Sequence, residues 1–254
     1  MLKLLVLSLL SIILVACQTN SLPKIITSST DLTSAIGYSS VALVYYDHNS
    51  VGENHLKPYC TGVWIDQFHI LTALHCVKVM QQITFHNLTA ENTHLPSLSQ
   101  LHLHYVLWNE VAGVEQEPLA WHLTNVIAWD EAHDLALLLG PWQGAGWHSW
   151  ASLGKHSPSL GSPITVLGMT HGYYWTFLQG WVSAYRGKIP GAEGIGFLQA
   201  QVPAHFGNSG GGAFNSAGEL VGLADFILDI PDQTVFIDLA SLKQFLHHSL
   251  PASF

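Results

Sequence analysis

Apolar residues recur along most of the chain in short runs that turn-forming residues separate. From about residue 35, apolar and β-branched runs alternate with clusters of Gly, Pro, Asn and Ser. Many short strands with turn signals between them indicate an all-β barrel or sandwich. The runs that we predict as strands are residues 41–46, 62–65, 69–72, 82–85, 135–138, 164–167, 175–178, 196–199 and 220–223.

One segment near the end of the chain follows a helical pattern instead. Its apolar residues recur at helical spacing, which predicts a helix over about residues 237–249. A stretch rich in Gly, Pro and Trp, between residues 140 and 161, interrupts the strands. We therefore predict two halves, over about residues 35–140 and 155–236, that are joined by this stretch and followed by the helix.

The longest apolar run lies at the N-terminus and has the features of an export signal. Lys3 precedes an almost wholly apolar segment that is too short to cross a bilayer. The segment ends in Leu14-Val15-Ala16-Cys17, which resembles the lipobox of bacterial lipoproteins, whose cysteine is acylated and becomes the new N-terminus. We therefore predict a signal peptide over residues 1–16 and lipidation at Cys17. The alternative is an ordinary signal peptide in which the cysteine is incidental.

The residues after Cys17 suit a tether between lipid and domain. Residues 17–34 are rich in Ser, Thr and Asn. Gln18 follows the cysteine, and the absence of Asp at this position implies sorting to the outer membrane if the host is diderm. We expect an extracytoplasmic protein that is anchored to a bacterial membrane through its lipid.

The composition excludes several classes of function. Hydrophobic residues make up 48% of the chain and charged residues 10%, and 17 acidic residues face 8 Lys and Arg. Nucleic-acid binding needs clustered basic residues, so a nucleic-acid partner is not expected. The apolar and aromatic residues throughout exclude a disordered chain. What remains is a globular protein that is large enough to bury a core.

Three segments that are far apart in the sequence carry the residue types of an acyl-transfer site. A serine nucleophile needs a neighbouring base and N–H groups aimed at the developing oxyanion. A histidine can exchange that proton near neutral pH, and a carboxylate fixes the tautomer of the histidine. The segments are Leu71-Thr72-Ala73-Leu74-His75-Cys76, His133-Asp134-Leu135-Ala136-Leu137-Leu138 and Gly207-Asn208-Ser209-Gly210-Gly211.

Each segment alone is a weak signal. Gly207-Asn208-Ser209-Gly210-Gly211 taken singly is equally a flexible turn, and His75 is one of 16 histidines. Asp134 alone reads as a turn residue before a strand, and Asp130 is its local rival, although no apolar run follows Asp130 directly. Only the three segments together indicate an acyl-transfer site.

Together the three segments resemble those of the trypsin/chymotrypsin-like serine peptidases, in the family's order of His, Asp and Ser. The resemblance covers about residues 35–248 and includes residues 60–65 before the histidine segment and residues 179–184. It implies an all-β fold of two antiparallel six-stranded β-barrels with a short C-terminal helix. It also implies one peptidase domain over residues 35–254 that acts as a serine endopeptidase on peptide or protein substrates.

The resemblance gives a role to individual residues. Ser209 would be the nucleophile, His75 the general acid and base, and Asp134 the residue that orients His75. The backbone N–H groups of Gly207 and Ser209 would form the oxyanion hole. The alternative function is a weak or inactive protease-like lipoprotein that holds peptides in the cleft.

The same resemblance pairs Cys60 with Cys76 as the family's disulfide beside the histidine, which suits an oxidising compartment. Asn208 stands where digestive members have Asp, which implies a site that forms without zymogen cleavage, as in the glutamyl-endopeptidase-like and HtrA-like branches. Too few residues follow Ser209 for the PDZ domain of the HtrA proteins.

Substrate specificity would depend on the side chains that line the pocket beside Ser209. The residues expected to line the pocket are Pro203, Ala204, His205, Ala224 and Asp225. Specificity for Glu is not predicted, because glutamyl-specific members carry a His where Leu223 or Ala224 stands here. No cofactor or metal is expected, because the alternating pair His102 and His104 lacks Cys or carboxylate partners at ligand spacing.

Overall fold

The computed structural model describes residues 29–48, 54–87, 95–108, 120–140, 149–189, 196–228 and 230–250. The predicted signal peptide, Cys17 and residues 18–28 of the tether lie outside the described residues. Within the described part, no helix is both long enough and apolar enough to cross a membrane.

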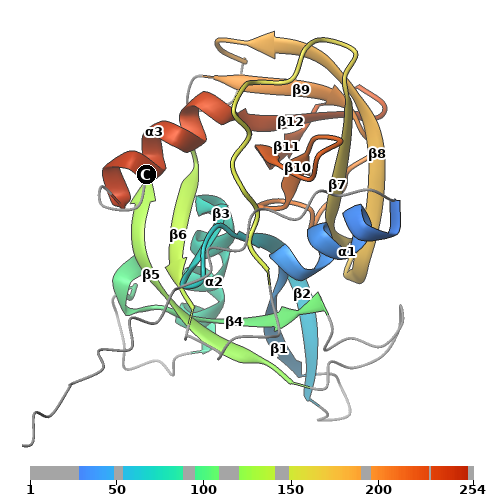
Figure 1. Ribbon diagram of the computed structural model, residues 1–254. Helices are drawn as coiled ribbons and strands as arrows, with labels where there is room; N and C mark the ends of the chain where they lie inside the picture. The colour runs from blue at the N-terminus through green and yellow to red at the C-terminus, as the bar shows by residue number, and fades with distance from the viewer. Residues whose placement is uncertain are drawn as a thin grey trace, which may run out of the picture.

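Two closed antiparallel barrels of six strands each make up the body of the protein, as the sequence predicts (Figure 1). The strand order is β1-β2-β3-β6-β5-β4 in the first barrel and β10-β11-β12-β9-β8-β7 in the second. The elements are α1 (Ser29–Ser39), β1 (Ser40–His48), β2 (Asn54–Trp64), β3 (His69–Ala73), α2 (Leu74–Asn87), η1 (Leu98–Gln100), β4 (His102–Leu107), β5 (His122–Asp130), β6 (Leu135–Leu139), β7 (Pro163–Thr170), β8 (Tyr173–Arg186), β9 (Phe197–Gln201), β10 (Gly212–Phe214), β11 (Leu220–Ile227), β12 (Gln233–Asp238) and α3 (Leu239–Ser249).

The buried apolar residues of the described part of the chain form four packed clusters, the smallest of which joins β1 and β4 to β7 and β8. Each barrel has its own buried core, with Trp64 and Tyr105 in the first and Leu198 and Phe236 in the second. A third cluster lies between the barrels and combines residues of both with residues of α1 and α3. Burial of this shared surface holds the barrels together, so the groove between them has fixed walls.

The prediction of a strand at residues 82–85 is wrong, because these residues belong to α2. Ile83 and Thr84 are β-branched and therefore imitate a strand locally. In the fold, Cys76, Val77 and Met80 lie on the side of α2 that packs into the core of the first barrel. This burial overrides the weak helix propensity of the segment.

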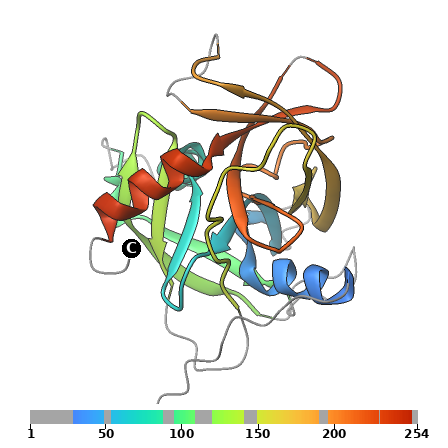
Figure 2. The same cartoon turned by 45° about the horizontal axis from the view of Figure 1, so that its top comes forward.

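The C-terminal helix begins two residues later than predicted. Ile237 and Asp238 still pair with β11, so they end β12 rather than starting the helix. The Asp238 side chain then accepts a hydrogen bond from the backbone N–H of Ser241 at 2.9 Å, which caps α3. Figure 2 shows α3 running from the second barrel across to the first, and its Phe245 and Leu246 belong to the cluster between the barrels.

Helix α1 overlaps the end of the predicted tether, so the folded body begins before residue 35. Its Ile36 is buried in the cluster between the barrels. The hydroxyl groups of Ser39 and Ser40 both donate to the carbonyl of Ile36 and so close the turn into β1. The sequence pattern did not indicate this helix, because its residues are mostly small and polar.

The described part of the predicted linker is bound to both barrels rather than loose. The backbone N–H of Ala151 donates to the carbonyl of Trp64 in the first barrel at 2.8 Å. Leu153 forms a parallel bridge with Leu220 in the second barrel, and the N–H of Gly154 donates to the Leu220 carbonyl at 2.8 Å. This segment therefore adds hydrogen bonds to the apolar contact between the barrels.

Candidate active site

His75 and Asp134 form the most tightly connected pair in the groove. The ring Nδ1–H of His75 donates to Oδ2 of Asp134 at 2.5 Å, and the backbone N–H of His75 donates to Oδ1 at 2.9 Å. The backbone N–H of Leu74 donates to the Asp134 carbonyl at 2.8 Å. Three hydrogen bonds therefore join the first turn of α2 to the turn before β6, and they fix the imidazole ring.

The backbone at Asp134 is itself unusual. Asp134 has φ +52°, in the left-handed region, which Asp tolerates better than most residues other than Gly. The tight turn of residues 131–134 between β5 and β6 requires this conformation and turns the carboxylate toward His75. The neighbouring Asp130 has a different partner, since it binds His133 Nδ1 at 2.7 Å. The structure thus separates the predicted residue from its rival.

Ser209 lies in a turn whose shape depends on two glycines. Gly207 has φ +97°, and a Cβ atom there would meet the carbonyl oxygen of Met169 at 1.7 Å. Gly210 has φ +79°, and a Cβ atom there would meet the carbonyl oxygen of Thr61 at 2.2 Å. Only glycine satisfies both the dihedral angle and the space at these positions.

Thr61 of β2 connects this turn to the first barrel. Its backbone N–H donates to the carbonyl of Ser209 at 2.9 Å, and its hydroxyl donates to the carbonyl of Gly207 at 2.8 Å. The same hydroxyl accepts a hydrogen bond from the N–H of Met169 at 3.2 Å, and the carbonyl of Thr61 accepts one from the hydroxyl of Thr72. Thr61 is fully buried, so these hydrogen bonds form without competition from water.

Three carbonyl groups of the serine turn accept hydrogen bonds from neighbouring segments of the protein. The carbonyl of Phe206 accepts from the N–H of His171 at 2.8 Å, and those of Gly207 and Ser209 accept from Thr61. Within the described residues, the N–H groups of Gly207 and Ser209 have no internal acceptor. These two donors are therefore available to a bound oxyanion.

Asn208 supports the turn from within. It is only 1% exposed, and its side-chain NH₂ donates to the carbonyl of His205 and to the hydroxyl of Thr170, both at 3.1 Å. A neutral amide therefore satisfies this buried position with partners from its own barrel.

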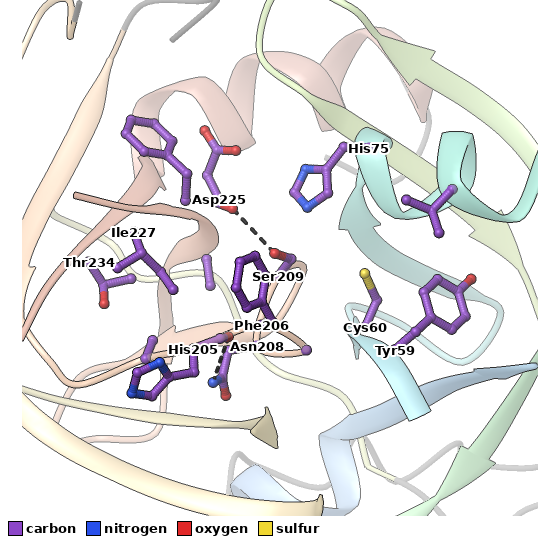
Figure 3. Close-up of a pocket in the computed structure, with 15 residues that line it drawn as sticks. Tyr59, Cys60, His75, His205, Phe206, Asn208, Ser209, Asp225, Ile227 and Thr234 are labelled. Atoms are coloured by element: carbon purple, nitrogen blue, oxygen red, sulfur yellow. Dashed lines mark hydrogen bonds between the residues drawn. The ribbon is translucent and has the colours of Figure 1, made fainter. Parts of the chain in front are cut away.

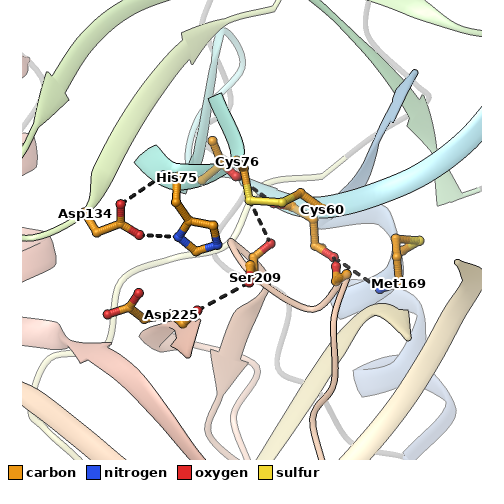
Figure 4. Close-up of a disulfide and its surroundings, with 10 residues drawn as sticks. Cys60, His75, Cys76, Asp134, Met169, Ser209 and Asp225 are labelled. Atoms are coloured by element: carbon orange, nitrogen blue, oxygen red, sulfur yellow. Dashed lines mark hydrogen bonds and ion pairs between the residues drawn. A yellow bond between two sulfur atoms is a disulfide. The ribbon is translucent and has the colours of Figure 1, made fainter. Parts of the chain in front are cut away.

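The predicted disulfide joins Cys60 and Cys76, with their Cα atoms 6.1 Å apart. Cys60 precedes Thr61, and Cys76 follows His75, so the disulfide joins β2 to the first turn of α2 beside the site (Figure 4). Figure 4 also shows the imidazole of His75 lying between Asp134 and Ser209. The structure therefore brings together the three residues that the sequence motifs single out.

The hydroxyl of Ser209 faces Asp225 in this arrangement. It donates to the backbone carbonyl of Asp225 at 3.3 Å rather than to His75 (Figure 3). Both Ser209 and His75 line the same cavity, which has a volume of about 570 Å³. The full lining is Tyr59, Cys60, His75, Val79, Ala204, His205, Phe206, Gly207, Asn208, Ser209, Ala224, Asp225, Phe226, Ile227 and Thr234.

The cavity includes most of the predicted pocket residues. Ala204, His205, Ala224 and Asp225 line it, whereas Pro203 does not and lines a second hollow near Pro231. Further lining comes from residues that no motif indicated. They are mainly apolar. Phe206 is 79% exposed and Ile227, at the end of β11, is also exposed, whereas Thr234 of β12 is buried. The Thr234 hydroxyl is occupied, because it donates to the carbonyl of Val202 at 2.6 Å.

The acidic groups raise the proton affinity of the site. Burial lowers the pKa of His75, but the hydrogen bond and charge of Asp134 and the charge of Asp225 outweigh it, so the net pKa is raised. Burial raises the pKa of Asp225 to about 7, and Asp134 adds to this rise. The shift of Asp225 places its proton exchange near neutral pH.

Two groups within the described residues bring three metal-donor side chains together, and both contain His75. One combines it with Asp134 and Asp225, and the other with Cys60 and Cys76. The second offers no thiolate, because its cysteines are paired with each other. The hydrogen bonds of Asp134 to His75 compete with metal binding in the first.

Comparisons with known proteins agree with this geometry. A family model described as "Trypsin-like peptidase domain" matches residues 60–223. A protein of Pseudomonas fluorescens named "Probable periplasmic serine endoprotease DegP-like" is 41% identical over 72 residues, which are 28% of this chain and 15% of that protein. A protein of the same name from Hahella chejuensis is 37% identical over 73 residues, or 28% of this chain and 16% of that protein. The alignments thus span less than a fifth of these relatives.

Solved structures resemble the fold over most of the chain. A serine endoprotease from Yersinia pestis aligns with a TM-score of 0.60 and 18% identity, over 90% of this chain and 69% of that one. An inactive mutant form of Rv3671c from M. tuberculosis H37Rv aligns with a TM-score of 0.58 and 14% identity, over 88% of this chain and 92% of that one. At these identities the likeness concerns the fold alone.

Proposed function

The chain belongs to the family of trypsin-like peptidase domains, and we propose that it is a serine endopeptidase that hydrolyses peptide bonds through an acyl-enzyme on Ser209. The observation that carries this proposal is the position of the His75 imidazole in the groove that also contains Ser209. Asp134 fixes it by accepting one hydrogen bond from the ring and one from the backbone N–H of His75. The N–H groups of Gly207 and Ser209 beside it supply the donors that acyl transfer needs.

The proposed mechanism uses these groups in turn. The hydroxyl of Ser209 leaves the carbonyl of Asp225, gives its proton to Nε2 of His75 and attacks the scissile carbonyl carbon. The N–H groups of Gly207 and Ser209 donate hydrogen bonds to the oxyanion that forms. His75 then gives the proton to the leaving amine, and a water molecule hydrolyses the ester by the same route in reverse. Asp134 holds the tautomer of His75 and stabilises the imidazolium ion throughout.

The cavity indicates what the enzyme would take. Ala204, Phe206, Ile227 and the occupied hydroxyl of Thr234 present a mainly apolar surface next to Ser209. Burial of apolar area is the main attraction that such a pocket offers. We therefore propose an uncharged, apolar side chain on the substrate residue that precedes the cleaved bond.

The proposed enzyme lies outside the cytoplasm and needs no cleavage of its chain to become active. The curated relatives are named periplasmic, and the disulfide Cys60–Cys76 suits an oxidising compartment, which supports an extracytoplasmic protein. Cys17 is its proposed lipid attachment site. Asn208 is satisfied by His205 and Thr170, which supports a site that forms without cleavage of the chain.

Labelling with a fluorophosphonate tests the proposed function. Because the reagent reacts only with an activated serine, we expect one label on the folded protein and none on Ser209→Ala. Ser183→Ala is the matched control, since Ser183 is exposed on β8 and outside the cavity, and it should label as the parent does. Absence of label on folded parent protein, together with binding of peptides in the cleft, would favour the alternative of an inactive peptide-binding protein.

A further inference from the structure

Asp225 has no side-chain role in the mechanism above, yet its carboxyl group lies beside His75 and Asp134. One donor atom from each of the three residues lies within 4.8 Å of the other two. Figure 4 shows the Asp225 carboxyl on the same side of the imidazole as Asp134. These three groups come from β11, from α2 and from the turn before β6, so the fold alone brings them together.

A β-bulge explains why Asp225 reaches the site. On β11, Ala224 pairs with Phe236 and Phe226 pairs with Val235, so Asp225 is the extra residue of the ladder. A bulge frees one residue from strand pairing and redirects its side chain. The carbonyl of Asp225 holds the hydroxyl of Ser209, while its carboxyl is turned toward the His75–Asp134 pair.

Two carboxyl groups this close in a half-buried place favour sharing one proton. Burial raises the pKa of Asp225 to about 7, and the charge of Asp134 and a hydrogen bond between the two carboxyl groups add to this rise. Both carboxyl oxygens of Asp134 already accept hydrogen bonds from His75. The shared proton therefore belongs on Asp225.

We infer that Asp225 is a positioning residue that acts on His75 through Asp134. In its protonated form its carboxyl donates a hydrogen bond to Asp134, and in its ionised form it places a second negative charge beside the imidazole. The inference rests on the proposed role of His75 as the base. No bond between heavy atoms changes in this step, since only a proton moves between Asp225 and solvent.

The proposed effect of Asp225 on the protonation of His75 depends on pH in one direction. As pH rises, Asp225 loses its proton, and the added negative charge stabilises the imidazolium form of His75, so His75 keeps its own proton to a higher pH. The other titratable groups of the cavity are Tyr59 from β2 and His205 from the loop before Ser209. Burial raises the pKa of Tyr59, which keeps it neutral. Asp225 and Asp134 are therefore the acidic groups that act on His75.

Titration of His75 by NMR tests this without any activity. The spectra are recorded in the Ser209→Ala protein, and the signal that disappears in His75→Gln is assigned to His75. With Asp225→Asn, which keeps the shape and a donor but not the charge, we expect the pKa of His75 to fall by at least about half a unit. Asp225→Ser, smaller and also neutral, should shift it in the same direction. Asp66→Asn is the matched control, since Asp66 pairs with His69 outside the cavity, and it should leave the His75 signal unchanged.

The pH profile of peptide hydrolysis is the second readout. With Asp225→Asn the acid limb of kcat/KM should move to lower pH, so that the ratio of kcat/KM at pH 6 to that at pH 8 rises about threefold. Unchanged His75 titration in both folded Asp225 variants would overturn the inference, whatever the activity shows. Failure of the proposed function would appear separately, as absence of fluorophosphonate label on protein whose His75 still responds to Asp225.

Discussion

The two walls of the groove hold their reactive groups in different ways. On the first barrel, a side chain holds the reactive group, since the Asp134 carboxylate accepts two hydrogen bonds from His75 and thereby fixes the ring. On the second barrel, the conformation of the main chain holds the reactive group. There Ser209 sits in a turn defined by the positive φ of Gly207 and Gly210, while its own hydroxyl is held only by a 3.3 Å hydrogen bond to a carbonyl.

This difference shows how each wall can fail. The first wall depends on the identity of side chains, so a change that keeps the shape but alters hydrogen-bonding capacity should disable it while the fold persists. The second wall depends on the absence of side chains, so a single added methyl group should distort it. Thr61 belongs to the first barrel but holds the turn of the second, and therefore couples the two walls.

Replacing Asp134 by Asn should have the largest effect on activity. The amide keeps the shape but favours the wrong tautomer of His75, so kcat should fall by on the order of 10⁴ with little loss of fold. Steady-state hydrolysis of a peptide substrate measures the fall. Asp130→Asn is the control, because Asp130 binds His133 outside the cavity, and it should retain parental kcat. Equal losses in both variants would mean that the side-chain wall is not specific to the His75 pair.

Gly207→Ala should have the next largest effect. The new Cβ would meet the Met169 carbonyl at 1.7 Å, so the turn must shift and its N–H groups lose their alignment. Because the loss of one oxyanion donor costs about 10²–10³ in rate, we expect a fall of this size in kcat, with a lower melting temperature.

The control variant Gly161→Ala tests the effect of a positive φ alone, since Gly161 has φ +77° and its Cβ would meet nothing within 4 Å. It should cost about 1 kcal/mol of stability and leave kcat intact. Parental activity in Gly207→Ala would contradict the main-chain account of the second wall.

Replacing Thr61 by Val should have the smallest of the three effects on activity, and it removes a contact between the two walls. The methyl group replaces the hydroxyl that donates to Gly207, so a buried carbonyl loses its partner at a cost of about 1–3 kcal/mol. Chemical denaturation measures this cost, and kcat should fall about tenfold as the serine turn loosens. The matched control is Thr124→Val, because the buried Thr124 hydroxyl donates to the Leu139 carbonyl inside the first barrel. A similar fall in kcat for Thr124→Val would show that general loss of stability, rather than the link between the walls, affects the site.

The strand pattern predicts an all-β fold, and the family resemblance that the three motifs carry implies the double barrel with His75, Asp134 and Ser209 in one groove. The pattern failed where packing overrides local preference. The β-branched residues Ile83 and Thr84 imitate a strand but lie in α2, because Cys76, Val77 and Met80 on the same helix bury against the first barrel. The helix boundary at Asp238 was displaced for a similar reason, since strand pairing with β11 extends further than the apolar period suggests.

The parts of the site that the sequence could not predict come from long-range geometry. Thr61 follows Cys60 in a segment that the resemblance singles out, but nothing in the sequence shows that its hydroxyl reaches a carbonyl 146 residues away. The sequence predicts Asp225 in the pocket only because the resemblance places the strand around residues 223–226 there. Its closeness to Asp134 depends on a bulge in β11, and no local pattern marks a bulge that arises from strand register.

Helix α3 has a consequence for shortened forms of the chain. His75, Asp134 and Ser209 all precede it, whereas Phe245 and Leu246 belong to the apolar cluster that unites the barrels. A chain that is cut before residue 239 keeps every reactive group but loses part of that cluster, so its two barrels should hold together less firmly and the groove between them should widen more easily.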